Sequence, residues 1–311
     1  LPHQPHRFTP EGFVYPGGPH GFTQGGGVKG WRVPEPGVAL VQQRHLLQLG
    51  YADHLVGRIL NRIRTNGDFD RAMIVLTADH GFAFDADKSR RDAAPDNLAG
   101  TVNPPLIVKY PGQKKGSIST ASTQGIDIVP TITRQLGVDG SYPVAGIPLG
   151  EAGDDRVMNI SMNGMSRMTA TAGEIREQRK RILALQISRL GTGGLWTLGP
   201  RPRLIGKRPS GRVNAAGASV RIDNPSRLDR VRPGSGKVPA LISATVRGIK
   251  PDRTLAIVLN GRIRATARTF IHEGAVRFGA MLPPSKFRRG HNEVSVRVVR
   301  RGRLLRVKRL S

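Results

Sequence analysis

The sequence predicts an α/β layer in residues 1–150, a connecting segment with one helix in residues 151–215, and a small all-β, sandwich-like domain in residues 216–311. Two observations carry this prediction. In the first half, apolar residues recur at helical spacing and then in short strand-like runs, in the order helix, strand, strand, helix. Beyond about residue 240 the apolar period changes to two, and Gly, Pro or Asn separate the runs.

The first elements of the α/β layer follow a long irregular stretch. Residues 1–37 are rich in Gly, Pro and His, and compact domains usually keep such a segment only for function. Apolar residues at three- and four-residue spacing predict a helix over 41–64, which Asn66-Gly67 ends. The apolar run that follows predicts a buried strand over 73–77, and we expect it to lie in a parallel sheet.

The remaining elements are predicted from equally local signals. A second buried strand covers 106–108, and Asp127 is expected to be the N-cap of a helix that ends at Gly137. One amphipathic helix is predicted over 174–187. Asn260-Gly261 indicates a hairpin in the β-rich part. The predicted strands of that part are 241–246, 255–259, 275–278 and 294–299.

The charge of the 311-residue chain is concentrated in its second half. Residues 1–150 hold 15 basic and 12 acidic residues, whereas residues 151–311 hold 34 and 10. A polycationic half is expected to bind phosphate, sulfate or carboxylate polymers or an anionic membrane face. The chain has no cysteine, which excludes disulfides and thiolate chemistry, and no apolar run long enough to span a membrane.

Residues 77–81, Thr-Ala-Asp-His-Gly, are the most informative motif of the chain. Asp79 and His80 follow a predicted strand, at the sheet edge where α/β proteins build their sites. Their oxygen and nitrogen donors suit a divalent cation of the zinc or manganese kind. We expect Gly81 to let the backbone turn away sharply. The alternative is that Asp79 is an ordinary cap and His80 an ordinary loop histidine.

Five motifs follow one another along the first half of the chain, at residues 1–5 (LPHQP), 51–57 (YADHLVG), 77–81 (TADHG), 105–112 (PLIVKYPG) and 127–131 (DIVPT). In this order and at this spacing they resemble the C-terminal part of the sulfatase-like catalytic domain of the alkaline phosphatase superfamily. The resemblance covers roughly the first half of the chain. It implies that Asp79 and His80 ligate a divalent metal (Mn, Zn, Mg or Ca) and that His3 contacts the substrate or its leaving group.

The resemblance also implies what the sequence lacks. The family's nucleophile is a Thr, a Ser or a Cys oxidised to formylglycine in the N-terminal half, and it is not in this sequence. The chain opens in what looks like the middle of a fold, so we expect a missing upstream part and no activity by residues 1–311 alone. His80 stands where arylsulfatases commonly have Asn, which favours the phosphotransferase branch.

Three further residues are weaker candidates for substrate binding. Arg90 and Arg91 lie in the loop after Asp79-His80 and could bind a polyanion, although loop arginines are usually only solvated. Lys109 follows the second predicted strand and could meet an anion, or it could face water. His6 is a weaker candidate than His3. His20, His45 and His54 are expected to be structural.

The function favoured by these observations is hydrolysis or transfer of a sulfate or phosphate ester. One alternative is a phosphoglycerol or phosphoethanolamine transferase of the cell envelope, and the other is a non-catalytic polyanion-binding scaffold. The basic tail, residues 216–311, is predicted to contact anionic lipid or cell-wall polymer. Nucleic acid is not favoured, because aromatic platforms for bases are scarce. Members of this kind often have upstream membrane segments, which would place this portion outside the cytoplasm.

Overall fold

The computed structural model describes residues 3–17, 30–138, 140, 143–153, 156–162, 166–191, 194–211 and 213–310. The chain divides into two compact units, each described by itself. The site unit contains Arg62–Ala83 and Ser89–Ala184, and the sheet unit contains Leu1–Asn61, Phe84–Lys88 and Leu185–Ser311. This division follows spatial proximity, so the domain boundaries predicted near residues 150 and 215 stay predictions.

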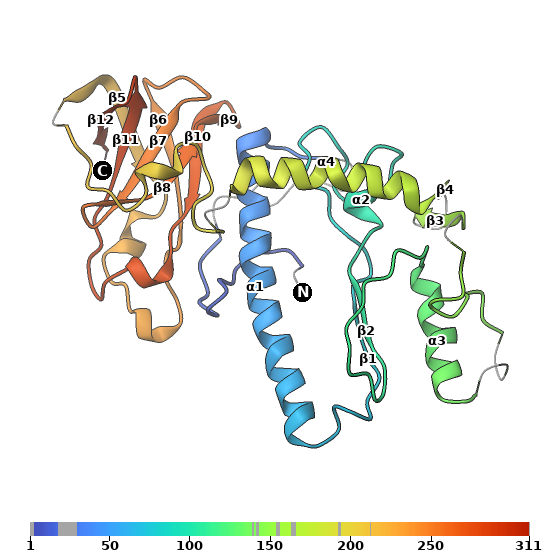
Figure 1. Ribbon diagram of the computed structural model, residues 1–311. Coiled ribbons are helices and arrows are strands. Elements are labelled where there is room, and N and C mark those ends of the chain that lie inside the picture. The colour runs from blue at the N-terminus through green and yellow to red at the C-terminus, as the bar shows by residue number, and fades with distance from the viewer. Residues whose placement is uncertain are drawn as a thin grey trace. The chain divides into compact units, whose positions relative to one another are not determined.

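Two short strands form the centre of the site unit. β1 (Ile74–Thr77) pairs with β2 (Leu106–Lys109) in an antiparallel two-stranded sheet, with Val75 opposite Val108. Figure 1 shows the two strands side by side. Among the described residues the connection between them contains only the four-residue helix α2 (Leu98–Thr101).

The predicted parallel, buried arrangement of these strands is wrong. A parallel pair needs a crossover that carries the chain back to the start of the first strand, usually a full helix, and α2 is too short for that. The chain turns back instead, so the strands run antiparallel. Two strands cannot cover both of their faces, and Leu76 and Ile107 are 38% and 58% exposed.

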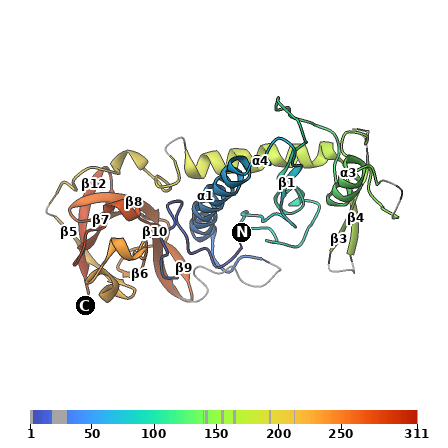
Figure 2. The ribbon, with the colours of Figure 1, turned by 90° about the horizontal axis from the view of Figure 1, so that it is seen from below.

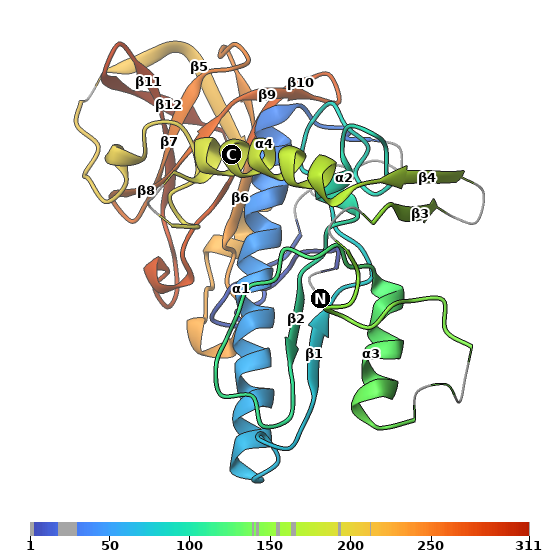
Figure 3. The ribbon, with the colours of Figure 1, turned by 45° about the vertical axis from the view of Figure 1, so that its right-hand side comes forward.

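The predicted helices are confirmed. α1 (Glu35–Thr65) begins six residues before the predicted start and ends just before Asn66-Gly67, where Gly67 has φ +79°. α3 (Ile128–Gln135) starts directly after Asp127, and Gly137 follows its end with φ +70°. α4 (Ala172–Leu190) follows a hairpin of β3 (Met158–Met162) and β4 (Ser166–Ala170), which the sequence did not reveal (Figure 3).

Eight strands of the sheet unit form one mixed sheet (Figure 2). Their order is β8-β7-β11-β12-β5-β6-β10-β9. All neighbours are antiparallel except β12 and β5, which are parallel. The four predicted strands are confirmed, and Asn260-Gly261 joins β7 to β8 with positive φ at both residues. The strands are β5 (Asn214–Ile222), β6 (Leu241–Arg247), β7 (Thr254–Leu259), β8 (Arg262–Arg268), β9 (Phe270–His272), β10 (Ala275–Met281), β11 (Val294–Arg300) and β12 (Arg303–Arg309).

The inner face of this sheet and the start of α1 share one hydrophobic core. Val38 and Leu47 of α1 belong to the same cluster as Ile257, Phe278 and Val296 of the sheet, all at most 1% exposed. The sequence predicted a sandwich confined to residues 216–311. The structure instead has a single sheet whose core also takes in residues from the first 50 positions.

The Pro-rich segment before α1 is fixed by polar side chains of that helix. Gln48 donates to the carbonyl of His3 (2.9 Å) and accepts from the backbone N–H of Arg7 (2.8 Å). Arg44, 1% exposed, donates to the carbonyl of His6 (2.6 Å) and to the hydroxyl of Tyr15 (3.2 Å). A spacing of four puts Arg44 and Gln48 on one face of α1, so both can hold the same segment.

Within the part of the chain that the structure describes, no helix has the length and apolar character needed to cross a membrane.

Candidate metal and substrate site

Asp79 and His80 lie just beyond the end of β1, in the site unit. Asp79 Oδ1 accepts a hydrogen bond from the backbone N–H of His80 (3.0 Å), which orients the carboxylate toward the imidazole. The side chain of Asp79 is 86% exposed and that of His80 is 35% exposed. The carboxylate is therefore oriented by this hydrogen bond while most of the Asp79 side chain faces solvent.

The hydrogen bonds of His80 indicate its tautomer. Nδ1 lies 2.8 Å from the carbonyl oxygen of Gly81, which can only accept, so Nδ1 carries the proton. Nε2 lies 2.6 Å from Nη2 of Arg91, which can only donate, so Nε2 presents its lone pair. A neutral imidazole with one nitrogen anchored to a backbone carbonyl is the form in which histidine binds metals.

The spacing of the two side chains fits two ligands of one cation. Asp79 Oδ2 and His80 Nε2 are 3.6 Å apart. Oxygen and nitrogen ligands of a tetrahedral zinc ion lie about 3.3–3.5 Å from each other, given their bond lengths to the metal. Among the described residues, however, no group of three or more His, Cys, Asp or Glu could hold a metal ion. The described residues therefore offer only two candidate ligands at this site, and the guanidinium of Arg91 lies beside them.

Gly81 is required by a close approach to α2. Its N–H donates to the carbonyl of Thr101 (2.7 Å), and a Cβ on Gly81 would lie 2.2 Å from the carbonyl oxygen of Gly100. The expected role of Gly81 in a sharp turn is replaced by a packing role: it lets the Asp79-His80 segment lie against the backbone of α2.

A Gly81→Ala substitution should therefore destabilise the site unit by about 1–3 kcal/mol, because the backbone of Gly100 must move to admit the methyl group. Gly57→Ala is the matched control: Gly57 lies inside α1 with nothing within 4 Å of the added Cβ. That change should stabilise the protein by about 0.4–1 kcal/mol. Urea unfolding, with hydrogen exchange at β1 and α2, measures both. Equal effects of the two substitutions would contradict the packing role of Gly81.

The neighbouring cations differ in their surroundings. Arg90 is 6% exposed and lies over the ring of Phe82, with its guanidinium carbon 5.7 Å from the ring centre. Burial, and secondly the charge of Arg91, lowers the pKa of Arg90. Lys109 donates to three backbone carbonyls, those of Phe69, Asp70 and Ala72, which uses all three of its N–H bonds. Of the three weaker candidates, the structure brings only Arg91 to Asp79-His80.

His3 belongs to the sheet unit, whereas Asp79 and His80 belong to the site unit. Its side chain is exposed, with Nδ1 2.6 Å from the carbonyl of Gln4. Its contact with substrate stays a prediction, and Leu1 and Pro2 of the same motif lie outside the described residues. The sequence reasoning missed the two side chains that fix this segment, Arg44 and Gln48; their spacing of four on a predicted helix was the available signal.

A carboxylate and an imidazole presented together at a strand end, with an arginine beside them, are the kind of site that metal-dependent enzymes use on esters of oxyanions. Comparison with known proteins indicates which family of such enzymes the chain resembles. Residues 39–138 match the family model described as Sulfatase, so this part of the chain is similar to the sulfatase-like domains of the alkaline phosphatase superfamily.

A curated relative is the N-acetylglucosamine-6-O-sulfatase of Bacteroides thetaiotaomicron. It is 31% identical over 102 residues, which are 31% of this chain and 17% of that protein. The match thus spans less than a fifth of the relative's own length. No solved structure matches the chain.

Proposed function

We propose that this protein contributes the Asp-His half of a metal site in an enzyme that hydrolyses sulfate esters. One observation carries the proposal: Asp79 Oδ2 and His80 Nε2 lie 3.6 Å apart, a spacing that fits two ligands of one cation. The sulfatase-like match over residues 39–138, which includes both residues, supports the same reading.

The roles proposed for Asp79, His80 and Arg91 rest on their positions, and the role proposed for His3 rests on the family resemblance. Asp79 and His80 would hold a divalent ion, Mn²⁺, Zn²⁺, Mg²⁺ or Ca²⁺, whose charge helps to neutralise the oxygens of the sulfate group. Arg91, whose guanidinium lies at His80 Nε2, would turn to the sulfate oxygens and bind them in its planar fork. His3 would donate a proton to the leaving alkoxide, a step that general acids accelerate by roughly 10²–10⁴-fold.

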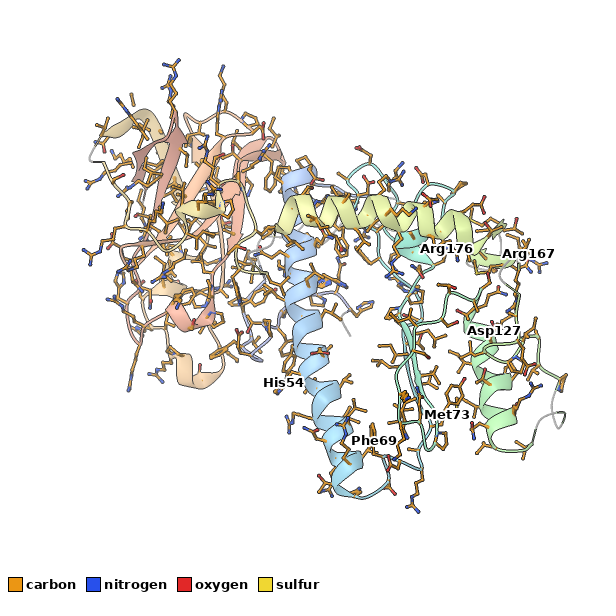
Figure 4. The ribbon with its side chains drawn as sticks, viewed as in Figure 1. His54, Phe69, Met73, Asp127, Arg167 and Arg176 are labelled. Carbon is orange, nitrogen blue, oxygen red and sulfur yellow. The ribbon has the colours of Figure 1, made fainter. Side chains whose placement is uncertain are left out.

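Metal binding tests the proposal directly. Titration of the 311-residue chain with Mn²⁺ or Zn²⁺, followed by calorimetry, should show a site whose affinity falls at least about tenfold in Asp79→Asn or His80→Ala. Asp53 and His54 form a matched control, because they are also an adjacent Asp-His pair, both exposed, but on α1 (Figure 4). Adjacent helical residues point about 100° apart, so Asp53→Asn and His54→Ala should leave the affinity unchanged. Equal losses in both pairs would overturn the proposed site.

The described residues supply only two ligands, so we propose that the nucleophile and the remaining ligands come from elsewhere. Residues 1–311 alone should then show no metal-dependent turnover of 4-nitrophenyl sulfate. Turnover that disappears in Asp79→Asn would contradict this part of the proposal.

Phosphoryl transfer is the second candidate, favoured by His80 at a position where arylsulfatases commonly have Asn. Parallel assays with 4-nitrophenyl phosphate distinguish it. Membrane anchoring and an extracytoplasmic location are further proposals that the resemblance supports.

A further inference from the structure

The outer face of the sheet unit carries basic residues in register on adjacent strands. Lys308 of β12 lies opposite Ser219 of β5, which in turn lies opposite Arg247 of β6. In a second row, Arg221 of β5 lies opposite Thr245 of β6, which lies opposite Arg277 of β10. Because neighbouring strands are about 4.8 Å apart, the backbones of the two basic residues in each row are about 9–10 Å apart. The basic face is defined as Arg221, Arg247, Arg277, Arg297, Arg306 and Lys308.

Strand alternation explains why these residues share a face. In β5, Val220 and Ile222 belong to the hydrophobic core, so Ser219 and Arg221 point the other way. In β6, Ala244 and Val246 are in the core and Thr245 and Arg247 are not. Ser219 and Arg221 of β5 and Thr245 and Arg247 of β6 are therefore polar or basic side chains on the face away from the core.

Little of this charge is neutralised. Asp223 pairs with Arg277, with Oδ2 2.5 Å from Nη2. Among the described residues, Arg221, Arg247, Arg306 and Lys308 form no ion pair, and all four are exposed. The charge of Glu293 raises the pKa of Arg297, which offsets only part of the lowering caused by burial and by Arg306.

Two arginines of the face even oppose each other. Arg297 of β11 is the direct cross-strand partner of Arg306 of β12, an arrangement of like charges that destabilises a sheet. Nε of Arg297 is buried and has no hydrogen-bond partner among the described residues. Burial, and then the charge of Arg306, lowers the pKa of Arg297. An anion bound between the two guanidinium groups would relieve both penalties.

The chemistry of the face selects among anionic partners. Arginine forks match the oxygens of sulfate and phosphate groups, and the hydroxyls of Ser219 and Thr245 lie between the cations. No aromatic side chain occupies this face in β5, β6 or β12, and Phe270, the cross-strand partner of Arg277, is buried, so bases would have no stacking platform. Large apolar side chains that could enter a bilayer are lacking beside the cations in β5 and β6, and Leu304 of β12 is buried in a hydrophobic cluster.

We propose that the basic face of β5, β6, β10, β11 and β12 binds a sulfated polysaccharide, with rows of cations on its sulfate groups and the Ser and Thr hydroxyls on its sugars. The preference for sulfate over other anions rests on the proposed sulfate-ester function. Binding at the face is independent of the metal at Asp79 and His80, so the two proposals can fail separately.

Binding of the 311-residue chain to dextran sulfate, with unsulfated dextran as reference, tests the proposal. A triple variant, Arg221→Gln, Arg247→Gln and Lys308→Gln, should weaken dextran sulfate binding by at least about tenfold at 0.1 M salt and flatten its salt dependence. The matched control is Arg58→Gln, Arg62→Gln and Arg179→Gln, which removes the same charge from exposed positions on α1 and α4. It should change the affinity by less than about threefold, the effect of net charge alone.

Three results would overturn the proposal: equal losses in both triple variants, equal binding of dextran and dextran sulfate, or tighter binding of single-stranded DNA or phosphatidylserine vesicles than of dextran sulfate. Circular dichroism checks that each variant is folded. Should the triple variant not fold, the single variants Arg247→Gln and Lys308→Gln keep the test open, because each should lower the affinity more than Arg58→Gln. Mn²⁺ binding should be the same in all of these variants. If the unsubstituted chain binds no Mn²⁺, that result contradicts the proposed metal site and leaves the proposed polysaccharide site untouched.

Discussion

Acidification from pH 7 to pH 5 should destabilise the sheet unit by about 4 kcal/mol, because two histidines are buried there without their protons. His6 is 2% exposed, and its ring meets that of His45 edge-on, 5.1 Å between centres. His45 also packs on Phe84, with ring centres 5.0 Å apart. The charged form of either histidine would lose its hydration in this cluster.

Burial is the main cause of the shifts. It lowers the pKa of His6 to about 3, assisted by the positive charges of Arg44, His45 and His3. Burial likewise lowers the pKa of His45 to about 4. In the unfolded chain both pKa values return to about 6.5. Between pH 6.5 and the folded pKa values only the unfolded chain takes up protons, so the protein becomes less stable as the pH decreases. At pH 5 the loss is about 2 kcal/mol for each histidine.

Urea unfolding of the sheet unit at pH 7, 6 and 5 measures the effect. His45→Phe, which keeps an aromatic ring against Phe84, should remove about half of the pH dependence. His54→Phe is the control, since His54 is exposed on the same helix. A pH dependence that is unchanged in His45→Phe would refute the buried-histidine explanation.

How far the sequence predicts the site is shown by Asp79, His80 and Arg91. The Asp-His pair could be predicted because both ligands are adjacent in sequence and follow an apolar run. The orientation of the pair could not, because it depends on Arg91 and on the packing of Gly81 against α2, both set by tertiary contacts. For Lys109 the sequence showed a cation at a strand end. It did not show the three backbone carbonyls that accept hydrogen bonds from its ammonium group.

The same division holds for the fold. Strands β6, β7, β10 and β11 could be predicted because apolar residues dominate them. β5, β8, β9 and β12 were missed: basic residues occupy three of the seven positions in Arg262–Arg268 and four of the seven in Arg303–Arg309, which lowers the average hydropathy. In Arg262–Arg268 polar and apolar residues nevertheless alternate, which is the pattern of a strand with one face in the core. Strand direction was mispredicted for β1 and β2, because direction depends on the connection rather than on the strand.

Asp127→Asn should destabilise the site unit by about 3–5 kcal/mol, since it removes one partner of a buried ion pair. The side chain of Asp127 is 1% exposed and lies at the start of α3 (Figure 4). Its Oδ2 accepts from Arg156 Nη1 and from the backbone N–H of Gln124, both at 2.7 Å, and Oδ1 accepts from the N–H of Ile147 at 3.0 Å. The expected N-cap position is confirmed, but the carboxylate ties three separate segments together rather than capping α3.

The electrostatics of Asp127 add a pH signature to this prediction. Burial by itself raises the pKa of Asp127, but the hydrogen bonds from Arg156, Ile147 and Gln124 outweigh it and hold the pKa below its usual value. The contribution of the ion pair is therefore fully present above the unfolded pKa of about 3.9 and is lost as the pH falls further. In urea unfolding from pH 5 to pH 3, Asp127→Asn should therefore lose less stability on acidification than the unsubstituted chain.

The matched control is the pair of Arg134 and Glu151, which are ion-paired in the same unit but half-exposed. Glu151→Gln should cost only about 0–1 kcal/mol, because water screens an exposed pair. Adding Arg156→Met to Asp127→Asn should restore part of the lost stability, since no unpaired charge then stays buried. If Asp127→Asn and Glu151→Gln cost the same, the three segments around α3 are held by other contacts, and the buried ion pair of Asp127 adds little to stability.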